Sequence, residues 1–157
     1  QDALWAIADH HYKRRHFKKA AEAFTNVNLR KLPKDAQREL RFKRGHSLFE
    51  IEEYEKARYD LFEVMKKPGD FNEHATYYFS HIAYINNKPQ VALEGFESIA
   101  NHSDFKDIVP VYIAQTLHAT EHFSKLNLIH KPIICYYYLI HYVEPLINNV
   151  YLKSKIL

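Results

Sequence analysis

One column of residues recurs along this chain of 157 residues at intervals of 37, 35 and 34 positions. Its members are Phe17, Tyr54, Pro89 and Phe123. Small or apolar residues stand nine positions before and three, seven and ten positions after the column in the first three units. In the first three units these residues are Ala8, Ala20, Phe24 and Val27; Gly45, Ala57, Leu61 and Val64; and Ser80, Ala92, Phe96 and Ile99. The fourth unit matches only in part, with Ala114, Leu126, His130 and Ile133 at the same positions. A period of about 20–50 residues is typical of repeat proteins, so this column restricts the fold more than any other feature.

Each unit is expected to form two helices. In the first unit, apolar residues recur at spacings of three and four over positions 4–12 and again over positions 17–27, as on one face of a helix. The small residue of the first helix lets the second helix approach closely. Pro89 suits the first turn of a helix, where its missing N–H has no cost. A single helix pair cannot bury its apolar face, so the pairs are expected to stack.

The order of small residue, aromatic residue and alanine at this period resembles the tetratricopeptide repeat family. Three stretches carry the resemblance, which extends over about residues 2–125: Phe17–Phe24, Tyr54–Arg58 and Ala92–Phe96. It implies an all-α, right-handed superhelical solenoid of about four helix-turn-helix repeats plus a C-terminal helix. Two positions depart from the family pattern, because Arg44 replaces a leucine-like residue and Pro89 replaces the aromatic residue.

We expect a single domain over residues 1–157. The expected repeats span about residues 2–34, 37–70, 73–104 and 107–131, and a terminal helical segment spans about residues 132–152. This apolar segment would cover the last repeat, or pack on a second copy or a neighbouring domain. The chain does not begin with methionine, so we expect a processed chain or a fragment of a longer protein.

Charge is distributed unevenly along the chain. Residues 1–46 carry 12 Lys/Arg and 5 Asp/Glu, a net charge of +7, whereas residues 47–108 carry 6 and 12, a net charge of −6. This asymmetry favours polar contacts with other chains or with neighbouring segments. The basic stretch 13–19 is the best candidate for binding nucleic acid or acidic lipid. Because the basic runs lie on expected helices and not on a flexible tail, we favour a solvated turn between helices that is balanced by the acidic segment of a neighbouring molecule.

Family members bind extended peptides or partner helices along a concave face lined by the first helix of each pair, and the resemblance implies the same face here. The matching residues form an aromatic and histidine-rich set: Trp5, Asp9, Tyr12, Phe42, Lys43, His46, Tyr77, Tyr78, His81, Tyr112, Gln115 and His118. Aromatic residues are enriched at the centres of protein interfaces. The alternative is that about half of the set packs between neighbouring helices. Lys43 is the one cation at the positions of the family's carboxylate clamp, so an acidic chaperone tail is not the expected partner.

No nucleophile elbow, phosphate loop or nucleotide motif occurs, so we expect neither enzymatic activity nor a cofactor. His118 and His122 share a helical face, and His10, His11 and His16 form a second group. A third and a fourth ligand at a suitable spacing do not appear, so we expect no metal site. The single cysteine, Cys135, excludes a disulfide within the chain.

The expected function is that of a protein–protein interaction module or scaffold that binds a peptide or a partner helix. Two alternatives remain: a structural spacer that self-associates through its ends, and a nucleic-acid or anionic-surface binder that uses the basic N-terminal half. A homo-oligomer fits the first alternative, and no stretch of about 20 apolar residues predicts a membrane span. A narrower resemblance to repeat proteins of the bacterial envelope implies a periplasmic location, with the cytoplasm as the alternative.

Overall fold

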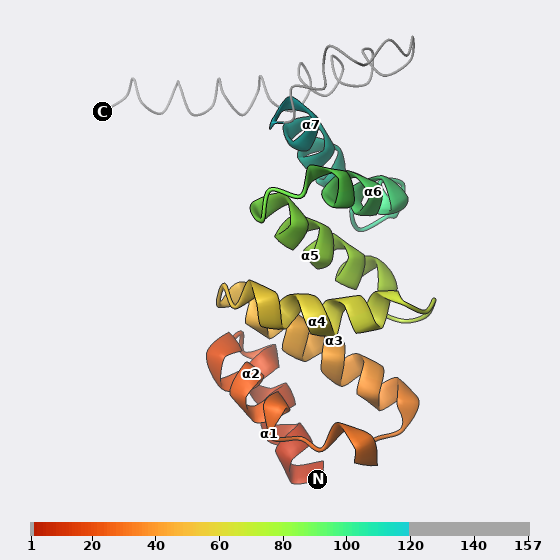
Figure 1. Ribbon diagram of the computed structural model, residues 1–157. Helices are drawn as coiled ribbons and strands as arrows, with labels where there is room; N and C mark the ends of the chain where they lie inside the picture. The colour runs from red at the N-terminus through yellow and green to blue at the C-terminus, as the bar shows by residue number, and fades with distance from the viewer. Residues whose placement is uncertain (1, 120–157) are drawn as a thin grey trace, which may run out of the picture. The chain divides into compact units, whose positions relative to one another are not determined.

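The computed structural model describes residues 2–119 and is entirely helical in that range, with no β-strand (Figure 1). The all-α fold class is therefore confirmed for the described residues. Its elements are α1 (Asp2–Lys13), α2 (Phe17–Thr25), the 3-10 helix η1 (Leu29–Lys31), α3 (Lys34–Glu50), α4 (Tyr54–Met65), α5 (Asn72–Ile85), α6 (Pro89–Ile99) and α7 (Val109–Ala119). The expected terminal segment and the column residue Phe123 lie outside the described residues.

The chain divides into two compact units, residues 1–88 and residues 89–157. In the first unit each helix packs against the next one in the sequence, from α1 through to α5, and α3 also contacts α5. In the second unit α6 packs against α7. The single domain over residues 1–157 stays a prediction.

The recurring column marks the start of the second helix of each pair. Phe17, Tyr54 and Pro89 are the first residues of α2, α4 and α6. The residues three and seven positions further on are completely buried, and those ten positions further on are at most 4% exposed. In order, these residues are Ala20, Ala57 and Ala92; Phe24, Leu61 and Phe96; and Val27, Val64 and Ile99. The sequence columns therefore form the core of the described helices.

The helices α1, α3 and α5 end with the same backbone geometry. Arg15, Glu52 and Asn87 each stand two positions before the column and have φ angles of 57°, 63° and 53°. After α1, the Arg15 N–H donates to the Tyr12 carbonyl and the His16 N–H donates to the His11 carbonyl, both at 2.9 Å. The same two hydrogen bonds recur after α3 and α5. This is the Schellman arrangement, in which glycine is the usual left-handed residue.

Close approach of α3 and α4 depends on Gly45. A Cβ atom at this position would lie 3.0 Å from Leu61 Cγ and 3.3 Å from Asp60 Cβ. The expected role of the small residue is thus confirmed for this helix pair. Ala8 and Ser80, at the equivalent positions of α1 and α5, are completely buried.

An arginine side chain holds the loop between α4 and α5. The Arg38 guanidinium of α3 donates to the carbonyl oxygens of Asp70 at 2.5 Å, Lys67 at 2.7 Å and Gly69 at 3.3 Å. In the same loop Phe71 has a φ of 65° and stacks on Phe42 of α3, with ring centroids 4.7 Å apart. The loop is therefore fixed to α3 by both polar and aromatic contacts.

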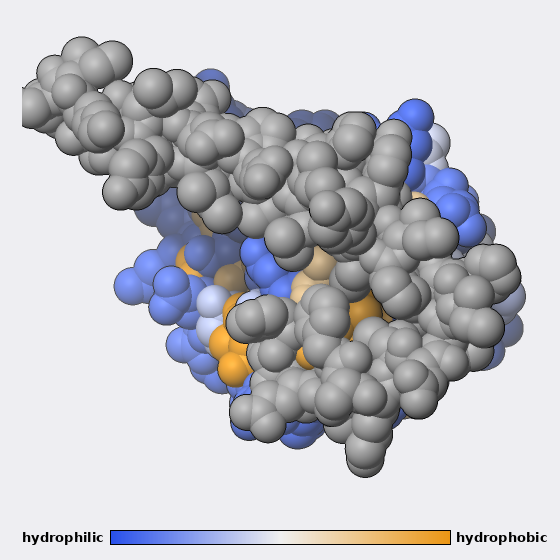
Figure 2. Space-filling model, turned by 90° about the horizontal axis from the view of Figure 1, so that it is seen from above, coloured by the Kyte–Doolittle hydropathy of each residue, from blue (hydrophilic) through white to orange (hydrophobic). Residues whose placement is uncertain are grey.

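The described surface visible in Figure 2 is mostly hydrophilic, with smaller hydrophobic areas. Large apolar side chains that are at least 40% exposed are Leu4, Ile7, Tyr59, Phe62, Ile85, Val91 and Ile108. None of the helices in residues 2–119 has the length and apolar character needed to cross a membrane.

Candidate binding surface

Nine of the twelve predicted site residues lie on α1, α3 and α5, which belong to the first unit. Seven of them are ring-bearing and form what we call the aromatic band: Trp5, Tyr12, Phe42, His46, Tyr77, Tyr78 and His81. The rings of Tyr12 and His46 are 5.6 Å apart, and those of His46 and Tyr78 are 4.5 Å apart and stacked. Tyr77 continues the band, 5.2 Å from Tyr78 and 5.9 Å from His81. The rings therefore form a chain of contacts that crosses three helices.

Lys43 connects the band to Trp5. Its ammonium group lies 5.9 Å from the Trp5 ring and 5.6 Å from the Tyr12 ring, both within cation–π distance. It also pairs with Asp9 at 2.5 Å and with Glu39 at 2.6 Å. The predicted site residues Asp9 and Lys43 are thus bound to each other across α1 and α3.

These pairs shift the ionisation of both partners. Burial tends to raise the pKa of Asp9, but the hydrogen bonds from Lys13 and Lys43 outweigh it and hold this pKa below its usual value. Burial tends to lower the pKa of Lys43, but the hydrogen bonds to Asp9 and Glu39 prevail and raise it. Both side chains are therefore charged at neutral pH, and this edge of the band is a closed ion cluster.

Both ring nitrogens of His46 have a polar partner. Its Nδ1 lies 2.7 Å from the Tyr12 hydroxyl and its Nε2 lies 3.2 Å from Glu50 Oε1. Burial lowers the pKa of His46, with the opposing effect of Glu50 second in size. Burial also raises the pKa of Tyr12, and it raises the pKa of Tyr78 to about 12. At neutral pH the band therefore presents a neutral imidazole between two neutral phenols.

Exposure separates the band into core and surface members. Phe42 is only 6% exposed and belongs to a buried cluster with Leu61, Val64 and Ile82. We therefore place Phe42 in the core beneath the band and not among the residues available to a partner. The other six ring-bearing members are partly exposed.

The remaining three predicted site residues lie on α7, in the second unit. Tyr112 stacks on Phe96 of α6 with ring centroids 5.4 Å apart, and Gln115 is exposed. His118 lies on the same helix, but its side chain is outside the described residues. A role for these residues in a shared surface stays a prediction.

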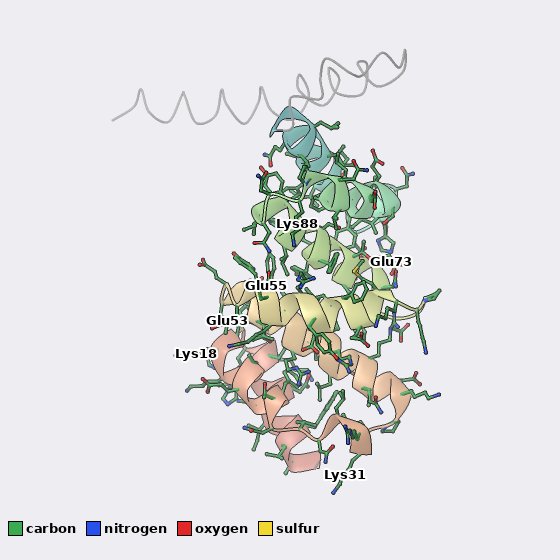
Figure 3. All side chains as sticks on the ribbon, viewed as in Figure 1. Lys18, Lys31, Glu53, Glu55, Glu73 and Lys88 are labelled. Atoms are coloured by element: carbon green, nitrogen blue, oxygen red, sulfur yellow. The ribbon has the colours of Figure 1, made fainter. Side chains whose placement is uncertain are left out.

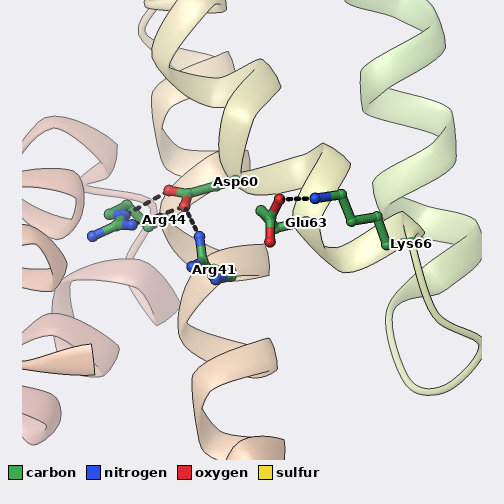
Figure 4. Close-up of polar contacts among 5 residues, drawn as sticks. All are labelled: Arg41, Arg44, Asp60, Glu63 and Lys66. Carbon is green, nitrogen blue, oxygen red and sulfur yellow. Dashed lines mark hydrogen bonds and ion pairs between the residues drawn. The ribbon is translucent and has the colours of Figure 1, made fainter. Parts of the chain in front are cut away.

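An ion cluster between α3 and α4 was not predicted (Figure 4). Arg44 donates from Nε to Asp60 Oδ2 at 2.6 Å and from Nη2 to Oδ1 at 2.8 Å, and Arg41 donates to Oδ1 at 3.1 Å. The Asp60 side chain is only 3% exposed. The departure from the family pattern at Arg44 was the sequence signal for this cluster. It joins a basic helix to an acidic one, so part of the charge asymmetry is satisfied within the chain.

The basic turn after α1 is exposed. Lys13 pairs with Asp9 at 2.7 Å, whereas Arg14, Arg15, Lys18 and Lys19 form no ion pair with any described residue. Figure 3 shows Lys18 on the same side of the first unit as Glu53 and Glu55, which belong to the next turn and the start of α4. Opposite charges therefore occupy one side of the unit.

No arrangement of three or more His, Cys, Asp or Glu residues within residues 2–119 could hold a metal ion. The rings of His10 and His11 lie 5.8 Å apart and those of His11 and His16 lie 6.0 Å apart. Comparisons with family models, curated proteins and solved structures found no match to the chain.

Proposed function

We propose that the protein is an interaction module that binds a peptide or a partner helix on the aromatic band of α1, α3 and α5. The observation that carries the proposal is the continuous chain of ring contacts across these three helices. Large rings provide apolar contact area at little entropic cost, and tyrosine and tryptophan are enriched among residues that dominate binding energy.

The recurring helix ends support the same function. We propose that the helix pairs form a tetratricopeptide-like stack, because three equivalent helices end in the same Schellman turn two residues before the recurring column. In such a stack the first helix of each pair contributes to one face, and α1, α3 and α5 are these first helices.

Peptide selection tests the proposal directly. The immobilised chain would be screened against displayed random peptides of about twelve residues, a length that spans several helices when extended. Enriched peptides would be synthesised with a fluorescent label and titrated by fluorescence anisotropy. We expect Tyr78→Ala and Trp5→Ala to weaken binding about tenfold, since an interface anchor contributes more than about 1 kcal/mol.

Tyr59→Ala is the matched control, because Tyr59 lies on α4 outside the band and is 62% exposed. It should leave the affinity unchanged. Circular dichroism of each variant separates loss of binding from loss of fold. Equal affinities for all three variants, or no enrichment over an unrelated helical protein, would contradict the proposal.

A further inference from the structure

We propose that the partner of the aromatic band is an acidic peptide, whose carboxylates pair with the basic turn after α1 while its apolar side chains contact the band. The basic turn consists of residues 13–19 and carries five Lys/Arg and no Asp/Glu. This inference rests on the function proposed above and adds the chemical class of the ligand.

The described part of the chain leaves most of the charge on the basic turn unneutralised. Four of its cations are exposed and form no ion pair with any described residue: Arg14, Arg15, Lys18 and Lys19. The fifth, Lys13, already pairs with a carboxylate of α1 at 2.7 Å. Cations so close together in the sequence repel one another, and an anionic ligand would offset that repulsion.

Arg15 and Phe17 join the basic turn to the aromatic band. The Arg15 guanidinium carbon lies 5.6 Å from the centroid of the Phe17 ring, and this ring lies 5.4 Å from that of His46 and 6.2 Å from that of Tyr12. Burial raises the pKa of Tyr78 and lowers that of His46, and in both groups the charge of Arg15 acts to lower the pKa. The positive charge of the turn therefore reaches band residues on α3 and α5.

The next turn on the same side of the first unit, after α3, is acidic but mostly paired (Figure 3). Three of the four glutamates in residues 50–55 have a partner within the chain: Glu50 with His46, Glu53 with Lys56 and Glu55 with Arg58. A cationic ligand at this turn would compete with these contacts. An anionic ligand at the four unpaired cations of the basic turn would not, so the surface favours an acidic partner.

The ring geometry of the band favours a peptide over a nucleic acid. Single-stranded nucleic acids bind proteins by stacking their bases on open aromatic faces. His46 stacks on Tyr78 with ring centroids 4.5 Å apart and on Phe42 with centroids 6.1 Å apart, and the Lys43 ammonium lies 5.9 Å from the Trp5 ring. These ring faces already have neighbours within the protein. Partly exposed rings packed in this way still offer apolar contact area to the side chains of a peptide.

The displayed random peptides of about twelve residues, used above, test the ligand class when they are selected on the wild type. We expect the enriched peptides to carry Asp or Glu next to apolar residues. A synthetic copy of one such peptide should bind the double variant Arg15→Gln and Lys18→Gln about fivefold more weakly, because two exposed ion pairs are lost. The wild-type affinity should fall as NaCl rises from about 50 to about 300 mM, and the affinity of the variant should fall less.

The matched control is the double variant Lys31→Gln and Lys34→Gln, which removes the same charge from exposed positions outside the basic turn. Figure 3 shows Lys31 well apart from Lys18. The control should bind the acidic peptide as the wild type does. Circular dichroism of both double variants checks that their helices are intact.

Three results would overturn the proposal. Neutral or basic peptides could be enriched whose binding still depends on Tyr78, or the two double variants could bind an acidic peptide equally well. In both cases the band binds peptides, so the proposed function stands and the acidic ligand class alone fails. A fluorescent twelve-nucleotide oligo(dT) that binds more tightly than the acidic peptide would identify a nucleic-acid surface instead. If no peptide is enriched, the proposed function fails and this inference fails with it.

Discussion

Three residues at the ends of α1, α3 and α5 hold a left-handed conformation that glycine normally adopts. Arg15, Glu52 and Asn87 have φ angles between 53° and 63°. Asparagine tolerates this region, whereas a residue with a longer side chain loses about 1–2 kcal/mol there. The two hydrogen bonds of each turn and the packing of the next helix hold the backbone in place.

Replacing one of these residues with glycine should stabilise the protein. Glu52→Gly removes the steric cost of the Cβ atom at a φ of 63°, and we expect a gain of about 1 kcal/mol in the free energy of unfolding. Urea denaturation followed by circular dichroism measures it. Glu22→Gly, the same change at an exposed position inside α2, should cost about 1 kcal/mol. A loss in both variants would contradict the expectation.

At the scale of elements, the contact between α3 and α4 combines close packing with a buried ion cluster. Gly45 lets the helices approach, and Asp60 accepts hydrogen bonds from both Arg41 and Arg44. The hydrogen bonds to Asp60 raise the pKa of Arg44 against the opposing effect of burial. The guanidinium groups of Arg41 and Arg44 share the Asp60 carboxylate, so both lose this ion pair if Asp60 is replaced.

Removing the shared carboxylate should therefore be costly. Asp60→Asn leaves two arginine side chains, 20% and 19% exposed, without their counter-charge. We expect a loss of about 3 kcal/mol in the free energy of unfolding, typical of a broken buried pair. Calorimetry or urea denaturation would measure the loss.

Glu63→Gln on the same helix provides the comparison for Asp60→Asn. Glu63 pairs with Lys66, whose side chain is 49% exposed, so this substitution should cost less than about 1 kcal/mol. Equal losses in the two variants would show that burial adds nothing to the Asp60 cluster.

At the scale of the whole molecule, the sequence predicted the periodic features well. The columns beginning at Phe17, Tyr54 and Pro89 start helices and supply core residues, because their spacing follows directly from burial on one helical face. The same periodicity placed Tyr12, His46 and Tyr78 on the first helices of their pairs, and their rings are in contact in the structure. The sequence did not predict the ion pairs, because periodicity does not show which carboxylate an arginine such as Arg44 will contact. The sequence pattern also did not show that Phe42, which is 6% exposed, stacks on Phe71 of the loop before α5.

The first compact unit should fold by itself. Residues 1–88 contain two buried clusters, one around Phe24 and Leu40 and one around Leu61 and Ile82. We expect a peptide of residues 1–88 to be helical by circular dichroism and to unfold cooperatively in urea. The same peptide with Leu61→Asp, a charge at a completely buried position, should lack that transition. A gradual loss of ellipticity in the parent peptide would show that residues 89–157 are required.

The chain has a single tryptophan, and it lies in α1 with its ring edge-on to Phe24 of α2 at 6.0 Å. Its fluorescence emission therefore reports the surroundings of α1, where Phe24 of α2 and the Lys43 ammonium of α3 approach the ring, whereas far-ultraviolet ellipticity averages over every helix. In the first unit each helix mainly contacts its neighbours in the sequence, so α1 and α2 can separate before the other helices of that unit. Trp5 fluorescence can therefore follow the separation of α1 and α2 without an added label.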